Sequence, residues 1–307
     1  MLIVEGPAGN GIGRAIASKL GLELLECEHR IFPDGESEVG IKGSVKDKDI
    51  LIVQTTYPQQ DKSLMELLFL ADDARKQGAR SIGAVVSYLA YDRQDGKFEG
   101  KNNTVSIETV LWLMNSVGIT SLATVTPHKE NSLSTFNGVV EVVYATGPLA
   151  EEVKMDLGDV NASDLLVLAP DKGALHIAKG FAEVIGCDYK YIEKQRDRIS
   201  GDIKLVKAPA DDFRGKVVVV VDDVISTGGT IAQAAAFAFN AGASKVVVAA
   251  THLVMAGDAY EKIKKSGVSE IYGTNTIPYS KAHMVDISKA IAEVVHEKSL
   301  KSRMKRT

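Results

Sequence analysis

Residues 217–230, VVVVVDDVISTGGT, combine two acidic side chains with a loop of glycine and hydroxyl residues. The five valines predict a strand buried on both faces of a parallel sheet, so Asp222 and Asp223 would follow at its carboxyl end, where α/β sheets bind ligands. Residues 226–230 lead into an alanine-rich helix expected from Ile231, so their N–H groups and hydroxyls could bind a phosphate. The carboxylates suit sugar hydroxyls or a metal ion. Together they predict a site for a phosphorylated pentose; the alternative is an ordinary strand–turn–helix.

A second candidate site lies on the long polar loop 88–103, which follows an expected strand over 81–87. Binding residues concentrate on loops at the carboxyl ends of parallel strands. Arg93 offers a forked donor for phosphate oxygens, and Gln94 could recognise the edge of a base. The alternative is a flexible surface loop.

Two more strand ends carry single candidates for metal or phosphate binding. His128 ends the expected strand 121–126, and its role there is either that of a ligand or that of an ordinary polar residue. Asp171 follows the expected strand 165–169 and could hold Mg²⁺, which prefers one or two carboxylates together with phosphate oxygens and water. Asp171 could equally cap a turn.

Lys194 and Arg196 follow an expected strand over 188–192 and would lie on one side of an extended segment. Two cations at a strand end could neutralise charge on a transferring phosphoryl group. A solvated run of charges is the usual explanation of such a segment.

The segment 30–38 contains a proline and a glycine that predict a turn, and an aromatic residue among acids. Phe32 and the neighbouring carboxylates could stack on an adenine and hydrogen-bond to it. From this segment alone, however, we expect Phe32 to pack into the core. We expect the same of Trp112, on a helix predicted over 107–117.

An internal repeat would position these candidates. Strand, loop, helix, turn and strand follow one another over 50–87 and again over 217–250, and only the second copy has the glycine and hydroxyl loop. Strands that alternate with helices predict an α/β fold of parallel sheets with helices on both faces. We expect two similar domains, 1–145 and 146–283, with 284–307 packing back on the first.

Composition excludes several classes of protein. The 307 residues are 45% hydrophobic and 25% charged, which is typical of a globular chain. A net charge of −4 gives no reason to expect nucleic acid as a partner, and no apolar run is long enough to cross a membrane. Two cysteines provide neither a disulfide framework nor a metal-ligand spacing. We therefore expect a cytoplasmic protein.

Seven short features occur in one order along the chain. They are FPDGE at 32–36, YDRQD at 91–95, the histidine at 128, PDKG at 170–173, EKQR at 193–196, DDVISTGGT at 222–230 and TNTIP at 274–278. In this order they resemble the ribose-phosphate diphosphokinase (phosphoribosyl-diphosphate synthetase) family over nearly the full chain. The resemblance implies two domains of the type I phosphoribosyltransferase fold, the second carrying the ribose 5-phosphate loop.

The resemblance also implies roles for the matching residues. Those that would contact ATP are Phe32, Asp34, Gly35, Glu36, Arg93, Gln94 and His128. Those that would bind ribose 5-phosphate are Arg196, Asp222, Asp223, Ser226, Thr227, Gly228, Gly229 and Thr230. His128 and Asp171 would hold Mg²⁺, and Lys194 and Arg196 would stabilise the reacting centre.

The implied reaction transfers the diphosphoryl group of MgATP to the 1-hydroxyl of ribose 5-phosphate, giving 5-phosphoribosyl 1-diphosphate and AMP. The resemblance implies a homodimer or a higher homo-oligomer, in which the segment 32–36 reaches a neighbour's ATP. Two alternatives are a non-catalytic regulatory relative and a phosphoribosyltransferase that consumes the diphosphate.

Three departures from the family's usual pattern concern the site directly. Asp92 stands where alanine is usual, and Thr126-Pro127-His128 replaces Asp-Leu-His, so a carboxylate that supports the histidine is missing from its usual position. Ser226 replaces a more common aspartate, although a hydroxyl can still donate to phosphate.

Overall fold

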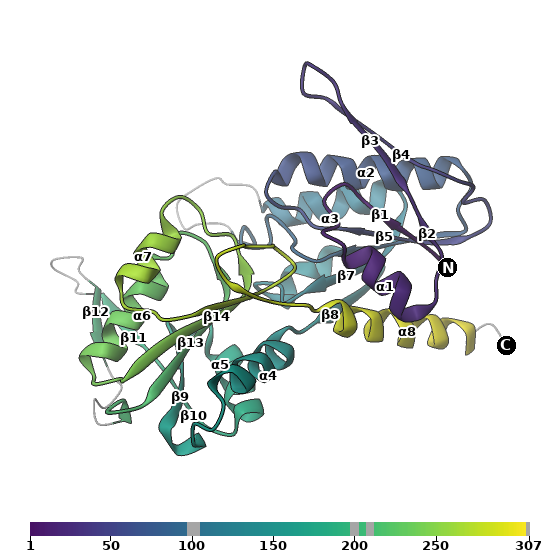
Figure 1. Ribbon diagram of the computed structural model, residues 1–307. Helices are drawn as coiled ribbons and strands as arrows, with labels where there is room; N and C mark the ends of the chain where they lie inside the picture. The colour runs from purple at the N-terminus through teal and green to yellow at the C-terminus, as the bar shows by residue number, and fades with distance from the viewer. Residues whose placement is uncertain (97–104, 197–202, 207–211, 305–307) are drawn as a thin grey trace. The chain divides into compact units, whose positions relative to one another are not determined.

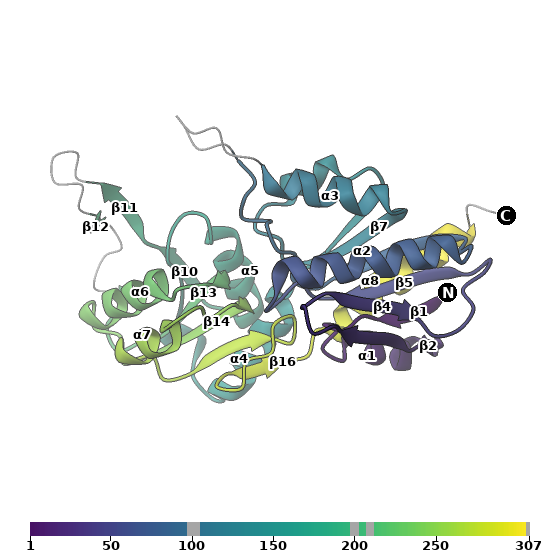
Figure 2. The ribbon, with the colours of Figure 1, turned by 90° about the horizontal axis from the view of Figure 1, so that it is seen from above.

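A computed structural model of the chain describes residues 1–96, 105–196, 203–206 and 212–304. It divides into two units, one formed by Met1–Tyr144 with Asp286–Thr307 and the other by Ala145–Val285. Each unit contains one parallel sheet with helices on both faces (Figures 1 and 2). The predicted α/β class is confirmed.

The first unit is built on a six-stranded sheet in the order β2-β1-β5-β6-β7-β8, in which all pairs are parallel. Its strands are β1 (Leu2–Glu5), β2 (Leu24–Leu25), β5 (Asp49–Gln54), β6 (Ser81–Val86), β7 (Ile119–Val125) and β8 (Val139–Val143). Its helices are α1 (Ile12–Leu20), α2 (Gln60–Lys76), α3 (Ser106–Ser116) and α8 (Ser288–Met304), with a 3₁₀ turn, η1 (Glu130–Thr135). Helices α2 and α3 cover one face, and α8 lies beside α1 on the other (Figure 1).

The second unit repeats this plan with the order β10-β9-β13-β14-β15-β16, again parallel throughout. Its strands are β9 (Leu165–Ala169), β10 (Asp188–Tyr191), β13 (Val217–Ile225), β14 (Lys245–Leu253), β15 (Ile271–Thr274) and β16 (His283–Val285). Its helices are α4 (Thr146–Leu157), α5 (Leu175–Ile185), α6 (Gly229–Asn240) and α7 (Ala259–Lys265), with a 3₁₀ turn, η2 (Ala162–Asp164). Val218, Val219, Val220 and Val221 are fully buried, as the valine run predicts.

Each unit also carries an antiparallel hairpin, which the chain forms between the second and third strands of the sheet. In the first unit this is β3 (Cys27–Ile31) with β4 (Ser37–Ile41), and in the second it is β11 (Glu193–Arg196) with β12 (Ile203–Val206). The predicted repeat over 50–87 and 217–250 is therefore part of a duplication that covers both whole sheets.

The structure corrects two local expectations. Strand β13 continues through Asp222 and Asp223 to Ile225, because its pairing with β14 extends to Ile225 beside Leu253. The acids interrupt the apolar pattern without interrupting the strand. Trp112 was expected in the core but is 65% exposed, because α3 turns its opposite face, which includes Leu111 and Met114, toward the sheet.

Among the described residues, no helix is both long and apolar enough to cross a membrane.

Candidate functional site

The loop between β13 and α6 has a backbone that only glycine can adopt at one position. Gly228 precedes the helix with φ 74°, in the left-handed region. A Cβ at Gly228 would lie 2.8 Å from the carbonyl oxygen of Ala259 and 3.1 Å from its Cα atom. Both the torsion angle and this close backbone contact therefore require glycine. The turn directs residues 226–228 into the N-terminus of α6, where N–H groups favour an anion.

A second segment holds this loop in place through backbone hydrogen bonds. The Met255 N–H donates to the Ile225 carbonyl at 3.0 Å, and the Ala256 N–H donates to the Ser226 carbonyl at 2.9 Å. The sequence reasoning missed these residues, because they act through main-chain atoms and their side chains carry no signal of it.

The two acids of β13 lie close together in a poorly solvated environment. Asp223 is buried, and its N–H donates to Asp222 Oδ1 at 3.0 Å, while the Val224 N–H donates to Asp223 Oδ1 at 2.8 Å. Burial raises the pKa of Asp222 strongly, and the charge of Asp223 raises it further. A cation or a pair of hydroxyl donors would relieve this cost, so the pair is suited to a sugar or a metal.

Asp171 joins this acidic group at the end of the neighbouring strand. Strands β9 and β13 are parallel neighbours, so their carboxyl ends lie at one edge of the sheet. The charge of Asp171 contributes to the raised pKa of Asp222. Asp171 Oδ1 also accepts a hydrogen bond from the Gly173 N–H at 2.9 Å, so the predicted turn cap is present. Within the described ranges, no group of three His, Cys, Asp or Glu residues is arranged to hold a metal by itself.

A buried polar cluster at the ends of β14 and β15 completes this edge of the second unit. His252 Nδ1 lies 2.9 Å from Thr276 Oγ1, and Thr274 Oγ1 donates to the Thr251 carbonyl at 2.8 Å. His252 is 4% exposed and pairs in register with Val224 of β13. The TNTIP motif indicated Thr274 and Thr276, whereas His252 stands inside an apolar strand and had no motif to identify it.

In the first unit, the tip of hairpin β3–β4 carries the FPDGE residues. The Phe32 N–H donates to the Glu36 carbonyl at 2.8 Å, and the Glu36 N–H donates to Asp34 Oδ1 at 3.1 Å. Phe32 is half-buried at this tip, and the Arg30 guanidinium lies 4.7 Å from the centroid of its ring. The expectation that Phe32 packs into the core was wrong, because the hairpin extends beyond α2 (Figure 1). The ring can therefore meet a ligand.

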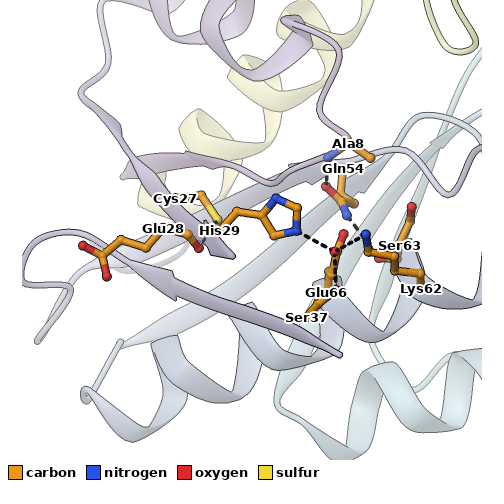
Figure 3. A network of polar contacts seen from close by, with 9 residues as sticks. All are labelled: Ala8, Cys27, Glu28, His29, Ser37, Gln54, Lys62, Ser63 and Glu66. Carbon is orange, nitrogen blue, oxygen red and sulfur yellow. Dashed lines mark hydrogen bonds and ion pairs between the residues drawn. The ribbon is translucent and has the colours of Figure 1, made fainter. Parts of the chain in front are cut away.

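A buried carboxylate of α2 anchors this hairpin (Figure 3). Glu66 is 2% exposed, and its Oε1 atom accepts the Ser37 hydroxyl at 2.8 Å and lies 2.9 Å from His29 Nε2. Lys62 Nζ lies 3.8 Å from the same oxygen. His29 and Ser37 come from the two strands of the hairpin, so one side chain fixes both strands just below the tip.

The polar loops after β6 and β7 lie side by side, because these strands are parallel neighbours. Arg93 and Gln94 are exposed, and Gln94 Oε1 accepts the Ser106 hydroxyl at 2.7 Å. His128 is exposed on the second loop. The structure thus brings three predicted ATP contacts to one edge of the first sheet.

Lys194 and Arg196 lie on β11, which pairs with β12. Their side chains lie outside the part of the chain that the structure describes, as do residues 97–104 of the predicted polar loop and 197–202 after the EKQR motif. Their predicted roles stay predictions.

Two family models match separate parts of the chain. The sequence profile of the N-terminal domain of ribose phosphate pyrophosphokinase matches residues 1–118, and that of the phosphoribosyl synthetase-associated domain matches residues 194–306. The ribose-phosphate pyrophosphokinase of Saccharolobus solfataricus is 42% identical over 95% of this chain and 99% of its own length. That of Methanothermobacter thermautotrophicus is 35% identical over 96% of this chain and 100% of its own length.

A solved structure agrees with these relatives. The crystal structure of phosphoribosylpyrophosphate synthetase from Mycobacterium smegmatis superposes with a TM-score of 0.87 at 26% identity, and the match covers 98% of this chain and 99% of that one. Similarity over the full length of both chains includes both sheets and both hairpins. The chain therefore belongs to the ribose-phosphate pyrophosphokinase family.

Proposed function

We propose that this protein transfers the diphosphoryl group of ATP to the 1-hydroxyl of ribose 5-phosphate, giving 5-phosphoribosyl 1-diphosphate and AMP. Membership of the family supports the reaction class. The observation that carries the proposal is the glycine and hydroxyl loop, which enters α6 directly after the acids of β13. Such a loop offers a phosphate site and a site for sugar hydroxyls within one short stretch.

In the second unit, we assign the 5-phosphate to Ser226, Thr227, Gly228, Gly229 and Thr230. Their hydroxyls and the first N–H groups of α6 are donors, and a phosphate accepts them. We assign the ribose hydroxyls to Asp222 and Asp223. The raised pKa of Asp222 means that its charged form is disfavoured without a ligand. Hydroxyl donors of the sugar would stabilise that charged form.

In the first unit, we assign ATP to Arg93, Gln94 and His128, and its adenine to the hairpin tip, Phe32, Asp34, Gly35 and Glu36. The half-buried ring of Phe32 supports a stacking role, since a core residue could not perform it. We further propose a homodimer or a larger homo-oligomer in which the tip completes a neighbour's ATP site. The extension of the hairpin beyond its own helix layer supports this (Figure 1).

We propose Mg²⁺ as the cofactor, with His128 and Asp171 as its protein contacts. The available groups fit this ion, because Mg²⁺ needs few protein ligands when phosphate oxygens and water complete its shell. When bound, it would neutralise phosphate charge. Lys194 and Arg196 would stabilise the charge that grows on the transferring group, and in such transfers positioning and electrostatics dominate. A cytoplasmic location is consistent with the unpaired Cys27 and Cys187.

The test is the formation of AMP from ATP, Mg²⁺ and ribose 5-phosphate. We expect stoichiometric AMP and 5-phosphoribosyl 1-diphosphate from the wild-type protein. Lys194→Ala is expected to lower kcat about a hundredfold, the usual cost of losing one group that stabilises transition-state charge, with little change in ribose 5-phosphate binding. The matched control is Lys190→Ala on β10, the strand that precedes β11 in the chain, which removes a cation that lies 3.0 Å from Asp212.

Absence of AMP would instead favour the regulatory relative or a phosphoribosyltransferase. Activity that survives Lys194→Ala at the wild-type level would contradict the catalytic assignment alone.

A further inference from the structure

A buried carboxylate joins the two polar loops that carry Arg93, Gln94 and His128. Asp92 follows β6 and is 6% exposed, whereas Arg93 and Gln94 next to it are exposed. The loop after β7 lies beside it, because β6 and β7 are parallel neighbours. Asp92 therefore points into the protein at the point where the two loops meet.

Both oxygens of Asp92 bind the neighbouring loop. Oδ2 accepts the N–H of His128, and Oδ1 accepts the hydroxyl of Ser132 at 2.7 Å. The first donor lies two residues before η1 and the second lies within it, so one carboxylate connects η1 to the segment that leads into it. A charged acceptor with little access to water makes stronger hydrogen bonds than a neutral one. Loss of this acceptor would leave its donors unpaired, which costs free energy.

The backbone on both loops is held in conformations that need such support. Tyr91, directly before Asp92, has φ 70°, and Thr126, two residues before His128, has φ 39°. Residues with a Cβ avoid the left-handed region, and β-branched residues avoid it most. Such conformations persist where the surrounding contacts determine them.

An ion pair with an exposed lysine joins the same loops at a second point. Lys129 Nζ lies 2.6 Å from Asp95 Oδ2, and the side chains of the lysine and the aspartate are 59% and 15% exposed. Water and salt screen a pair whose cation is exposed, so it contributes less to stability than a buried pair. The Asp92 carboxylate, with two hydrogen bonds to the neighbouring loop, is therefore the stronger of the two connections.

We propose that Asp92 is a positioning residue for ATP, which holds the His128 turn in a defined place relative to Arg93 and Gln94. The inference rests on the proposed function, since it assumes that these three residues contact ATP. It also accounts for two departures from the family's usual pattern together. The carboxylate missing at Thr126 has a counterpart at Asp92, on the opposite loop, and Asp92 binds the main chain of His128 itself.

The experiment compares Asp92→Ala and Asp92→Asn with the wild-type enzyme in steady-state kinetics and in hydrogen exchange of the His128 amide. We expect the KM for ATP to rise about tenfold in Asp92→Ala, equivalent to about 1.4 kcal/mol, and the KM for ribose 5-phosphate to stay within about twofold. Exchange of the His128 amide should be fastest in Asp92→Ala and slowest in the wild type. Asp92→Asn should be intermediate, because its amide oxygen can still accept one donor.

Three further variants separate positioning from general destabilisation. Ser132→Ala removes only the Oδ1 partner and should raise the KM for ATP by about threefold, equivalent to about 0.7 kcal/mol. Asp95→Asn alters the same loop at the ion pair with the exposed Lys129 and should leave both KM values within about twofold. Asp92→Ala combined with Thr126→Asp restores a carboxylate from the other loop and should recover most of the ATP affinity.

The inference is overturned if Asp92→Ala leaves the KM for ATP unchanged, or raises the KM values of both substrates equally while lowering Tm. A wild-type protein that forms no AMP would overturn the proposed function. Unchanged exchange at His128 in Asp92→Ala would overturn the structural connection whether or not AMP forms, so the two failures can be told apart.

Discussion

Two helices in this molecule follow a glycine with nearly the same torsion angles, but they differ in the acceptors available to the N–H groups of their first turns. Gly11 precedes α1 with φ 78° and ψ −2°, and Gly228 precedes α6 with φ 74° and ψ −7°. At α1, the Glu5 carboxylate accepts the N–H groups of Gly13 and Arg14 at 3.2 and 3.3 Å. At α6, no carboxylate within the described ranges takes these places, and the loop brings hydroxyls instead. One N-terminus is satisfied internally, and the other is available to an anion.

The two topologically equivalent loops differ in the same way. In the first unit, the loop after β5 corresponds to the glycine and hydroxyl loop after β13, which we propose binds the sugar phosphate. At the end of β5, Gln54 is fully buried, accepts the Ala8 N–H at 2.9 Å and donates to the Ser63 carbonyl at 3.1 Å. The two units thus share the sheet order, while in the first unit a buried side chain at the end of the third strand in this order bonds groups of its own unit. An available phosphate site requires that no internal group satisfies these donors.

The comparison is tested most severely by Gly228→Ala. We expect a loss of about 2–3 kcal/mol in the free energy of unfolding, because the new methyl group meets the Ala259 backbone at 2.8 Å and cannot move away. Displacement of the loop should also lower kcat/KM for ribose 5-phosphate by about a hundredfold, as misplaced contacts do. Urea denaturation and steady-state kinetics measure the two effects.

Gly11→Ala is the matched control. Its torsion angles are nearly the same, but a Cβ there meets no atom within 4 Å, so only the torsional cost of about 1–2 kcal/mol remains. Activity should be retained. Equal losses of stability in the two variants would show that the backbone contact at Ala259 does not matter.

The second prediction concerns the hairpin β3–β4, which the buried side chain of Glu66 anchors. Glu66→Ala should lower the free energy of unfolding by about 2 kcal/mol, because Ser37 and His29 lose their acceptor. The KM for ATP should rise more than the KM for ribose 5-phosphate if the tip contacts adenine. Glu38→Ala, an exposed position on the same hairpin, is the control, and an equal effect there would count against the anchor.

The third prediction concerns Asp222, one of the two acids that we propose bind the ribose hydroxyls. Asp222→Asn should stabilise the ligand-free protein by about 1 kcal/mol, as often happens when a binding residue is neutralised, and should abolish ribose 5-phosphate binding. The raised pKa of Asp222 means that the folded state retains a proton that the unfolded state has released. Stability of the wild type therefore falls as pH rises above the ordinary carboxyl pKa.

The stabilisation by Asp222→Asn should accordingly be larger at about pH 8 than at about pH 5, because the wild type loses stability across that interval and the amide does not titrate. Thermal melts of both proteins at the two pH values provide the measurement. A stabilisation independent of pH would mean that the pKa of Asp222 is not raised in the ligand-free protein.

The smallest expected effect belongs to Glu5→Gln. The amide oxygen can still accept from Gly13, but the negative charge near the α1 N-terminus is lost, which costs about 0.5 kcal/mol. Urea denaturation at low salt should resolve the change, and Glu23→Gln, an exposed change nearby, should have none. If Glu5→Gln were as damaging as Gly228→Ala, the contrast between an internally satisfied N-terminus and an available one would fail.

Local patterns were sufficient for much of the fold and for the turn that leads from β13 into α6. The run Val218–Val221 predicted a central strand, and the residues of the loop predicted its turn into a helix, because strand burial and glycine torsion angles are expressed in adjacent residues. The repeat over 50–87 and 217–250 was equally visible. The half-buried position of Phe32 at the hairpin tip was not, since a polar turn with one aromatic residue is compatible with a hairpin that packs inward or extends outward.

The amino-acid sequence by itself determined the α/β class, the duplication and the glycine turn before α6, because each depends on neighbours along the chain. Only the tertiary structure decided which donors are already satisfied: Glu5 at α1, Gln54 after β5, and Asp92 between the Arg93 and His128 loops. The partners of each of these side chains include groups on a different element or loop. A hydrogen bond between such segments depends on how parallel strands align their ends, and no local pattern of residues encodes that distance.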